Sequence, residues 1–91
     1  MEFEWDDPKA LANLEKHGVP FLFAVRAFDD LDRLDDEDRR QDYNEERRVT
    51  IGMIHGKVYV VAYTSRGESI RLISARPASA RERKRYAEES R

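Results

Sequence analysis

The hydrophobic residues of this 91-residue chain change their spacing part-way along it. In PFLFAVRAF, apolar residues counted from Phe21 to Phe28 fall at i, i+3, i+4 and i+7, which is the stripe of a helix that faces a core. From residue 47 onward the spacing becomes two, which is the period of β-strands. The pattern therefore predicts helices first and most of the strands afterwards.

The segment before that stripe is predicted to hold a short strand and a helix. Phe3–Trp5 has the composition of an edge strand. Asp7 is a suitable N-cap ahead of a proline, so a helix is expected over Pro8–His17. Leu11 and Leu14 share the apolar face of this helix, and the glycine that follows it occupies the place of a left-handed C-cap.

Three strands are predicted in the second half of the chain, at 47–54, 58–65 and 69–76. Their linkers, HGK and RGE, contain glycine and have hairpin length, so the strands should form an antiparallel meander. The middle strand is apolar on both faces, which is typical of a central strand.

A last helix is predicted over Ala80–Glu89. Pro77 cannot extend the ladder of the preceding strand, and Ser79 and Glu82 have the spacing of a capping box. We therefore expect a single α+β domain over residues 1–91, in the order strand, helix, helix, three-strand meander, helix. Its helices should pack against a small antiparallel sheet.

Charge is abundant and unevenly distributed along the chain. Charged residues make up 40% of it, against a usual share of about 25%. Residues 29–46 carry ten acids and three bases, whereas residues 66–91 carry eight bases and four acids. We interpret the acidic segment as a loop too charged to bury, with a short edge strand near Leu31–Leu34. The two segments meet different partners or each other, or they are simply solvated surface.

Several classes of function lack their signature in this chain. It has no cysteine, hence no disulfide and no thiolate metal site, which fits a reducing cytoplasm. No apolar run approaches the ~20 residues of a membrane span, and the acidic start is not a signal peptide. His17 and His55 form no metal-binding motif, and glycine-rich nucleotide loops are absent. We expect a cytoplasmic protein without a cofactor or metal.

The candidate chemistry lies in the arginines of the predicted sheet. Strict alternation along the last strand puts Arg71 on one face and Arg76 on the other. Arg48 belongs to the first meander strand, and Arg66 lies in the second hairpin. If the sheet curves, several of these side chains converge near the last helix. Guanidinium groups suit phosphate because they stay charged and donate bidentately.

Each candidate also has a purely structural explanation. Arg71 can pair with Glu68 or with an acid on a neighbouring strand, and the cations of the last helix can be plain solvated surface. Tyr63 and Tyr86 can stack on a base or donate to phosphate, but a tyrosine such as Tyr86 more often anchors a helix to a sheet. His17, beside a helix end, is more often a cap than a base.

Three blocks of the sequence resemble the BrnT-type toxins. FEWDDPKALANLEKHGVPF is similar to their F-W-D-x-x-K-x-x-x-N-x-x-K-H-G-V-x-F start, and ERRVTIGMIHGKVYVVAYTSRG to their central meander. IRLISARPASARERKRY is similar to their terminal I-R-I-I-S-A-R-x-A-x-x-x-E-R-x-x-Y signature. The chain departs from the family at Leu22 and Phe23, where polar or acidic residues are usual, and in its unusually charged loop.

The resemblance implies a toxin of a bacterial type II toxin–antitoxin pair with a RelE-like ribonuclease fold. It implies RNA cleavage by attack of the 2′-hydroxyl on the adjacent phosphate without a metal, which inhibits translation and growth. It also implies neutralisation by a ribbon-helix-helix antitoxin, in a heterotetramer that binds its own promoter DNA. The alternative is a non-catalytic module, such as a degenerate toxin, that only binds nucleic acid or antitoxin.

The expected site residues fall into three groups. Catalytic roles, in which arginines stabilise the charge of the phosphorane, are expected among Arg71, Arg76, Arg48, Glu46, His17 and Tyr86, with Glu68 as a further candidate base. RNA contacts are expected from Arg66, Tyr63, Arg81, Arg83 and Lys84. Antitoxin contacts are expected from Phe21, Leu22 and Phe23.

Overall fold

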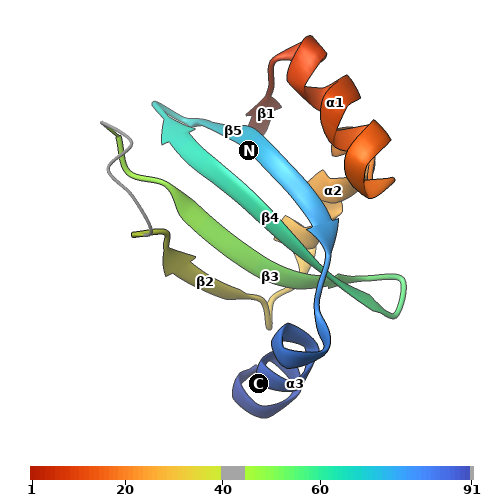
Figure 1. Ribbon diagram of the computed structural model, residues 1–91. Coiled ribbons are helices and arrows are strands. Elements are labelled where there is room, and N and C mark those ends of the chain that lie inside the picture. Colours follow the sequence, from red (N-terminus) through yellow and green to blue (C-terminus); the bar gives the residue numbers. More distant parts are fainter. Residues whose placement is uncertain (40–44, 91) are drawn as a thin grey trace.

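The computed structural model describes residues 1–39 and 45–90 and shows one five-stranded sheet with helices against it (Figure 1). Its elements in chain order are β1 (Glu2–Glu4), α1 (Asp7–His17), α2 (Phe21–Ala24), the 3₁₀ helix η1 (Val25–Asp29), β2 (Leu34–Glu37), β3 (Arg48–Ile54), β4 (Lys57–Arg66), β5 (Ser69–Pro77) and α3 (Ala80–Glu89). The strands lie in the order β1-β5-β4-β3-β2. The α+β class and the central meander are confirmed.

The sheet is mixed rather than antiparallel. β1 runs parallel to β5, with Glu2 opposite Ser69, whereas the other neighbouring strands are antiparallel. The expectation of an antiparallel sheet is therefore wrong at this edge. Hairpin turns make β3, β4 and β5 alternate in direction, but no hairpin joins β1 to β5, so no turn imposes an antiparallel pairing.

Tight turns join the three central strands close to the predicted boundaries. Ile54 pairs with Lys57 across His55 and Gly56, whose φ angles are 49° and 81°. Positive φ at both turn positions gives the twist that two adjacent strands need. The second hairpin turns at Gly67, where φ is 60°.

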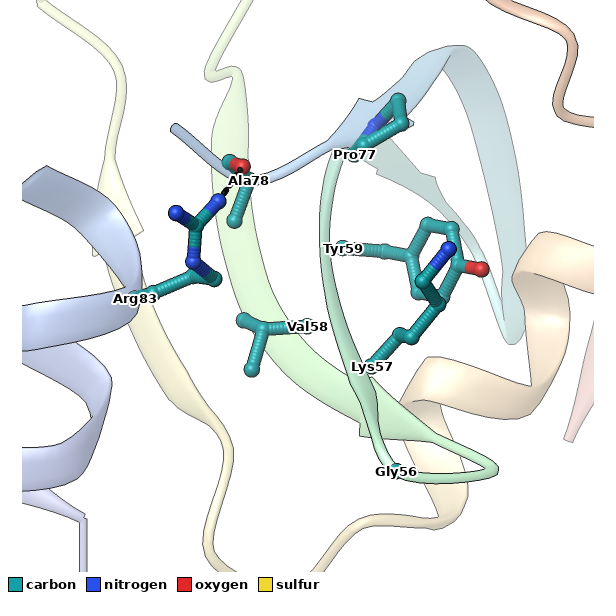
Figure 2. A pocket seen from close by; sticks show the side chains of 7 residues that line it. All are labelled: Gly56, Lys57, Val58, Tyr59, Pro77, Ala78 and Arg83. Atoms are coloured by element: carbon teal, nitrogen blue, oxygen red, sulfur yellow. Dashed lines mark hydrogen bonds between the residues drawn. The ribbon is translucent and has the colours of Figure 1, made fainter. Parts of the chain in front are cut away.

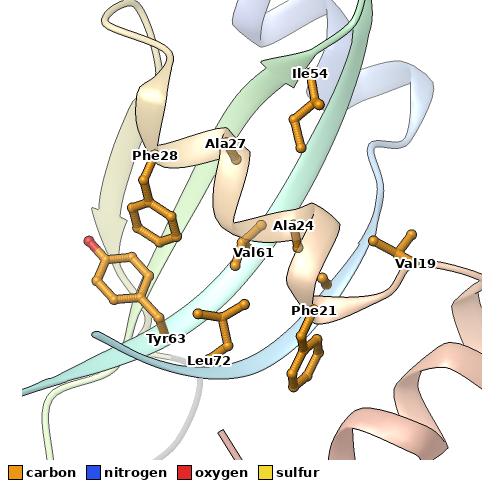
Figure 3. Close-up of a cluster of buried hydrophobic side chains, with 10 residues drawn as sticks. Val19, Phe21, Ala24, Ala27, Phe28, Ile54, Val61, Tyr63 and Leu72 are labelled. Carbon is orange, nitrogen blue, oxygen red and sulfur yellow. The ribbon is translucent and has the colours of Figure 1, made fainter. Parts of the chain in front are cut away.

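Apolar clusters lie on both faces of the sheet. We call the face covered by α2 and η1 the helical face (Figure 3). Its core is built from Val19, Phe21, Ala24, Ala27, Phe28, Ile54, Val61, Tyr63, Leu72 and Ala75. The opposite face carries α3 at one end, over a smaller cluster of Ile51, Val58, Val60, Ala78 and Tyr86. Within the part of the chain that the structure describes, no helix covers the rest of that opposite face (Figure 1).

The second helix is shorter than its apolar stripe predicts. The α-helical turn ends at Ala24, and the chain continues as the 3₁₀ helix η1 through Phe28. η1 packs closely on β3 at Gly52, where an added Cβ would lie 2.8 Å from the carbonyl oxygen of Ala27. Glycine at this position of β3 is therefore what allows η1 to approach the sheet.

The acidic segment contributes a strand to the sheet. The edge strand expected near Leu31–Leu34 is β2, which begins only at Leu34, and Leu31 is exposed. Asp38 is buried just after β2, contrary to the expectation that this segment is too charged to bury. Its backbone N–H donates to the carbonyl of Arg47 at 2.7 Å, so pairing to the chain before β3 continues beyond β2. Residues 40–44 of the expected loop lie outside the described part of the chain.

The ends of α1 are close to the prediction, but its buried face is not. The N-cap is Asp6 rather than Asp7, because the Asp6 carboxylate accepts from the N–H of Lys9 at 3.1 Å. Leu11 and Leu14, the expected apolar face, are both exposed, Leu11 at 57%. The helix therefore does not dock on the sheet through its leucines.

Asn13 is the buried residue of α1, with 7% of its surface exposed. Its Nδ2 donates to the carbonyl of Ala75 at 2.9 Å, and its Oδ1 accepts from the N–H of Ala75 at 3.0 Å. Nδ2 also donates to the carbonyl of Val19 at 3.1 Å. β1 pairs with β5 only as far as Arg71, so the Asn13 amide acts as hydrogen-bonding partner for the edge of β5 beyond it.

We expect Asn13→Ala to lower the free energy of unfolding by about 1–3 kcal/mol, because it leaves the buried N–H and carbonyl of Ala75 without a partner. The matched control is Leu11→Ala on the same helix, which removes a larger apolar side chain from an exposed position. Urea denaturation of both variants measures the difference. A Leu11→Ala loss as large as the Asn13→Ala loss would contradict this account of α1.

Candidate functional site

A β-bulge decides which arginines of β5 share a face. The pairing of β4 with β5 shifts between Ala62 and Tyr63, and Ile73 is the extra residue in β5. Alternation along β5 restarts there, so Arg71 and Arg76 both lie on the face opposite the helical face. The prediction that the two arginines face opposite sides is wrong, because strict alternation does not reveal a bulge.

A groove of about 320 Å³ lies on this face beside α3, and we call it the groove. Its apolar lining comes from Val49, Ile51, Val60 and Ala62 on the two central strands β3 and β4. Its polar and charged lining comes from Asp36, Glu37, Asp38, Arg39, Ser74, Arg76, Glu82 and Arg85. Of the arginines with an expected catalytic role, Arg76 is the one that lines it.

Arg76 is held in the groove by a bidentate ion pair with Glu82. Nη1 donates to Oε1 and Nη2 donates to Oε2, both at 2.8 Å. Oε1 also accepts from the N–H of Ser79 at 2.8 Å, and the N–H of Glu82 donates to the Ser79 hydroxyl at 3.2 Å, which confirms the predicted capping box. The Arg76 hydrogen bonds, with help from Ser79, lower the pKa of Glu82 to about 2.

The other two arginines of the groove are also paired with carboxylates. Arg85 donates to Asp36 at 2.7 Å across the gap between α3 and β2, and it also pairs with Glu89. The hydrogen bond to Asp36 raises the pKa of Arg85 further above its ordinary value. Arg39 pairs with Glu37 at 2.9 Å. Each of the three described arginines that line the groove therefore has an acidic neighbour.

Arg48, Tyr63 and Glu46 form a separate cluster associated with the helical face. Arg48 Nε donates to Asp35 Oδ1 and the Tyr63 hydroxyl donates to Asp35 Oδ2, each at 2.5 Å. Glu46 lies 3.4 Å from Arg48. Burial and the bond to Asp35 raise the pKa of Tyr63 to about 12. Tyr63 also packs edge-on against Phe28, with ring centroids 5.0 Å apart, so it belongs to the core.

Arg71 and Arg66 lie together, away from the groove. Both line a smaller cavity of about 130 Å³ at the other end of β5, which Thr64 also lines. Arg71 pairs with Glu4 of β1 at 2.9 Å, an acid on a neighbouring strand, and Arg66 lies 3.8 Å from Glu45. The expected convergence of Arg48, Arg66 and Arg71 with Arg76 beside α3 is therefore not what the structure shows.

Tyr86 has the surroundings of an anchor for α3. It is 8% exposed and packs in the cluster beneath that helix. Its hydroxyl donates to Asp30, which also accepts from the N–H of Met53 at 2.8 Å. Burial and the bond to Asp30 raise the pKa of Tyr86 to about 12, so its proton is held firmly.

The remaining candidate bases and the antitoxin candidates lie elsewhere. His17 ends α1, which packs beside β5, and Glu68 is exposed in the β4–β5 hairpin. Phe21 is buried against Trp5, with ring centroids 5.9 Å apart. Leu22, by contrast, is 74% exposed.

The cations of α3 differ in their surroundings. Arg81 and Lys84 are exposed and line a shallow hollow of α3 with Glu82, Arg85 and Glu88. Arg83 turns back and donates to the carbonyl of Ala78 at 3.0 Å (Figure 2). It lines a cavity of about 250 Å³, together with Gly56, Lys57, Val58, Tyr59, Pro77 and Ala78. In Figure 2, Lys57 and Arg83 lie on opposite sides of β4, so their charges do not converge.

Sequence reasoning missed the acidic half of the site and one of its arginines. The sequence indicates Glu82 only as a capping residue, and it marks neither Arg85 nor Asp36 as part of a site. Helical spacing carried a signal, because Glu82, Arg85 and Tyr86 fall at i, i+3 and i+4 and share one face of α3. The sequence carries no comparable signal for Asp36, because its pairing with Arg85 depends on where β2 lies in the sheet.

Within 1–39 and 45–90, His, Asp and Glu side chains form no group of three placed to hold a metal ion. In the same part of the chain, no helix has the length and apolar character needed to cross a membrane.

One comparison with known proteins gives a match. A family model described as "Ribonuclease toxin, BrnT, of type II toxin-antitoxin system" matches residues 5–82. The matched stretch includes Arg76 and Glu82 and stops before Arg85. A search of curated proteins found no match.

We expect the contribution of Glu82 to stability to depend on pH in the acid range. Its pKa is about 2 in the folded protein against 4.5 ordinarily, so the contribution is present above pH 4.5 and is lost as pH falls through about 2. The stability difference between wild type and Glu82→Gln should therefore shrink over this interval in urea denaturation at a series of pH values. In an Arg76→Ala background, the stability difference caused by Glu82→Gln should become largely independent of pH. If the pH dependence persisted there, it would not arise from the Arg76–Glu82 ion pair.

Proposed function

The chain belongs to the BrnT family of ribonuclease toxins of type II toxin–antitoxin systems, and from this premise we propose that it cuts RNA in the groove with Arg76 as its principal phosphate-binding residue. The proposal is carried by one observation. Arg76 is the sole arginine of the expected catalytic set, all of which the structure describes, that lines the groove, and an ion pair fixes its guanidinium there.

The chemistry we propose is attack of an RNA 2′-hydroxyl on the adjacent phosphate, without a metal ion. The reaction passes through a phosphorane that carries additional negative charge, and positioned guanidinium groups stabilise such charge. A guanidinium has five N–H donors, so it can hold a carboxylate on one edge and still contact a phosphate. Arg76 takes this role, and Arg85, which lines the same groove from α3, supports it.

The acids of the groove shape how RNA would bind. A phosphate that approaches Arg85 must compete with Asp36 for the guanidinium. None of the candidate bases expected from the sequence, Glu46, His17 and Glu68, lines the groove. Charge stabilisation by arginine is therefore the catalytic contribution of the groove.

A second candidate function is a non-catalytic module that binds nucleic acid or antitoxin. The observation in its favour is the charge of the groove, where four acids among the described residues line the same cavity as three arginines. Such a lining opposes a polyanion more than a purely cationic groove would. This module would bind RNA or antitoxin and leave RNA intact.

The partner we propose is a ribbon-helix-helix antitoxin, which forms a heterotetramer with the toxin in the cytoplasm and binds its own promoter DNA. Neutralisation requires that the antitoxin cover the groove. Leu22 supports a further contact, because it is a large apolar side chain that the fold leaves exposed. Phe23 is less suited to test this contact, since its ring packs against Tyr59 with centroids 5.4 Å apart.

We expect Arg76→Ala to lower the rate of RNA cleavage by roughly 10²–10³, the usual cost of removing one well-placed charge donor. The assay is gel electrophoresis of RNA incubated with purified protein in EDTA. Arg26→Ala is the matched control, because Arg26 bonds to His55 in the β3–β4 hairpin, outside the groove lining. Arg76→Ala protein that cuts as fast as wild type would refute the assignment, and bound but uncut RNA with wild type would favour the binding module.

We expect Leu22→Asp to weaken the complex with the ribbon-helix-helix protein encoded by a neighbouring gene by at least tenfold, without changing the unfolding midpoint. The substitution places a charge at an exposed apolar contact and breaks no core packing. Leu11→Asp on α1 is the control, since Leu11 is another exposed leucine. Calorimetric titration measures both dissociation constants, and an unchanged value for Leu22→Asp would remove the contact from the interface.

A further inference from the structure

We propose that Glu82 is a positioning residue for RNA cleavage, which acts by holding the Arg76 guanidinium in its working orientation. The inference rests on the proposed function of the groove and assigns Glu82 a role beyond its helix cap. The two residues belong to different elements, since Arg76 stands near the end of β5 and Glu82 in the first turn of α3.

One carboxylate joins the strand, the cap and the helix. Glu82 Oε1 accepts from both Arg76 Nη1 and the N–H of Ser79, and Oε2 accepts from Arg76 Nη2, with all three distances at 2.8 Å. The hydrogen bond from the N–H of Ser79 fixes the position of Oε1 independently of Arg76. The carboxylate is therefore a preset template onto which the planar guanidinium docks with two parallel bonds.

Fixing Arg76 matters because a free arginine has many rotamers. Immobilising such a side chain costs side-chain entropy each time a ligand binds. The side chain of Arg76 is 38% exposed, so packing alone does not immobilise it. Because Arg76 pairs with Glu82 when the protein folds, its side-chain entropy is lost at that stage. The guanidinium is therefore already in place when a phosphate enters.

Glu82 is better suited to this role than to that of a general base. Both of its oxygens are occupied by hydrogen bonds from Arg76, and Oε1 holds the cap as well. With a pKa of about 2, it would also take a proton poorly at neutral pH. Its effect on the reaction should therefore pass through Arg76.

The chain offers a control that separates positioning from capping. Ser79→Ala removes the hydroxyl that accepts from the N–H of Glu82, so it weakens the cap and leaves the Arg76–Glu82 pair. Glu82→Gln keeps one oxygen for the N–H of Ser79 but presents an NH₂ group to Arg76 in place of the second oxygen. The two variants thus disturb the same helix end and differ in what they do to Arg76.

The experiment is a double-mutant cycle on the full chain, read as single-turnover RNA cleavage with excess protein in EDTA. The variants are Glu82→Gln, Arg76→Ala, both together, and Ser79→Ala. We expect Glu82→Gln to slow the cleavage step by about 10- to 100-fold in the wild-type background. In the Arg76→Ala background it should change the rate less than twofold, and Ser79→Ala should stay within about threefold of wild type.

A second readout follows the guanidinium itself. In ¹⁵N-labelled protein, the Nη–H signals of Arg76 should show slow rotation in wild type and Ser79→Ala, and fast rotation in Glu82→Gln. This signature reports the orientation of Arg76 independently of turnover.

Each outcome distinguishes one role from another. Equal losses in both backgrounds would show that Glu82 acts on the substrate itself, and equal losses for Ser79→Ala and Glu82→Gln would show that it is only a cap. An active wild type with an equally active Glu82→Gln variant overturns the positioning role alone. A wild type that leaves RNA intact overturns the proposed function and the positioning role with it.

Discussion

The hydrogen bonds between the Asn13 amide and the peptide of Ala75 fix how the helices sit on the sheet. β1 covers the outer edge of β5 only as far as Arg71, and the amide acts as edge partner beyond that point. A third bond to the carbonyl of Val19 ties down the turn into α2, which with η1 covers the helical face. The opposite face is thereby left to α3 and the groove. A polar side chain thus orients the layers that the apolar residues fill.

The elements that local sequence specifies were predictable. Period-two strands with glycine turns gave the meander, and the spacing of Ser79 and Glu82 gave the start of α3. The features that depend on distant segments were not. The direction of β1, the bulge at Ile73 and the burial of Asn13 each depend on pairing with strands far along the chain. A period of two or 3.6 contains no information about such partners.

In the site too, local sequence revealed some features, and others depend on distant segments. Arginine was recognisable as the chemical group, because few side chains suit phosphate as well, and Arg76 does line the groove. The carboxylates that hold the arginines were not recognisable, since Glu82 and Asp36 gain that role only once α3 and β2 are in place. Arg48 shows the converse. The sequence made it a candidate for the same catalytic role, ranked after Arg71 and Arg76, but the register of β3 directs it to Asp35 and Tyr63 on the other side of the sheet.

The parallel pairing of β1 with β5 has a consequence for how the protein comes to be folded. The Glu4–Arg71 pair and the Asn13–Ala75 bonds join residues separated by 67 and 62 positions. Contacts of such long sequence separation form slowly, and a ribosome makes the earlier partner well before the later one. The β1–α1 segment therefore leaves the ribosome without its docking edge and waits for β5. The sheet that carries Arg76 is complete only after both segments are made, so the nascent chain has no assembled groove until β5 and α3 have been synthesised.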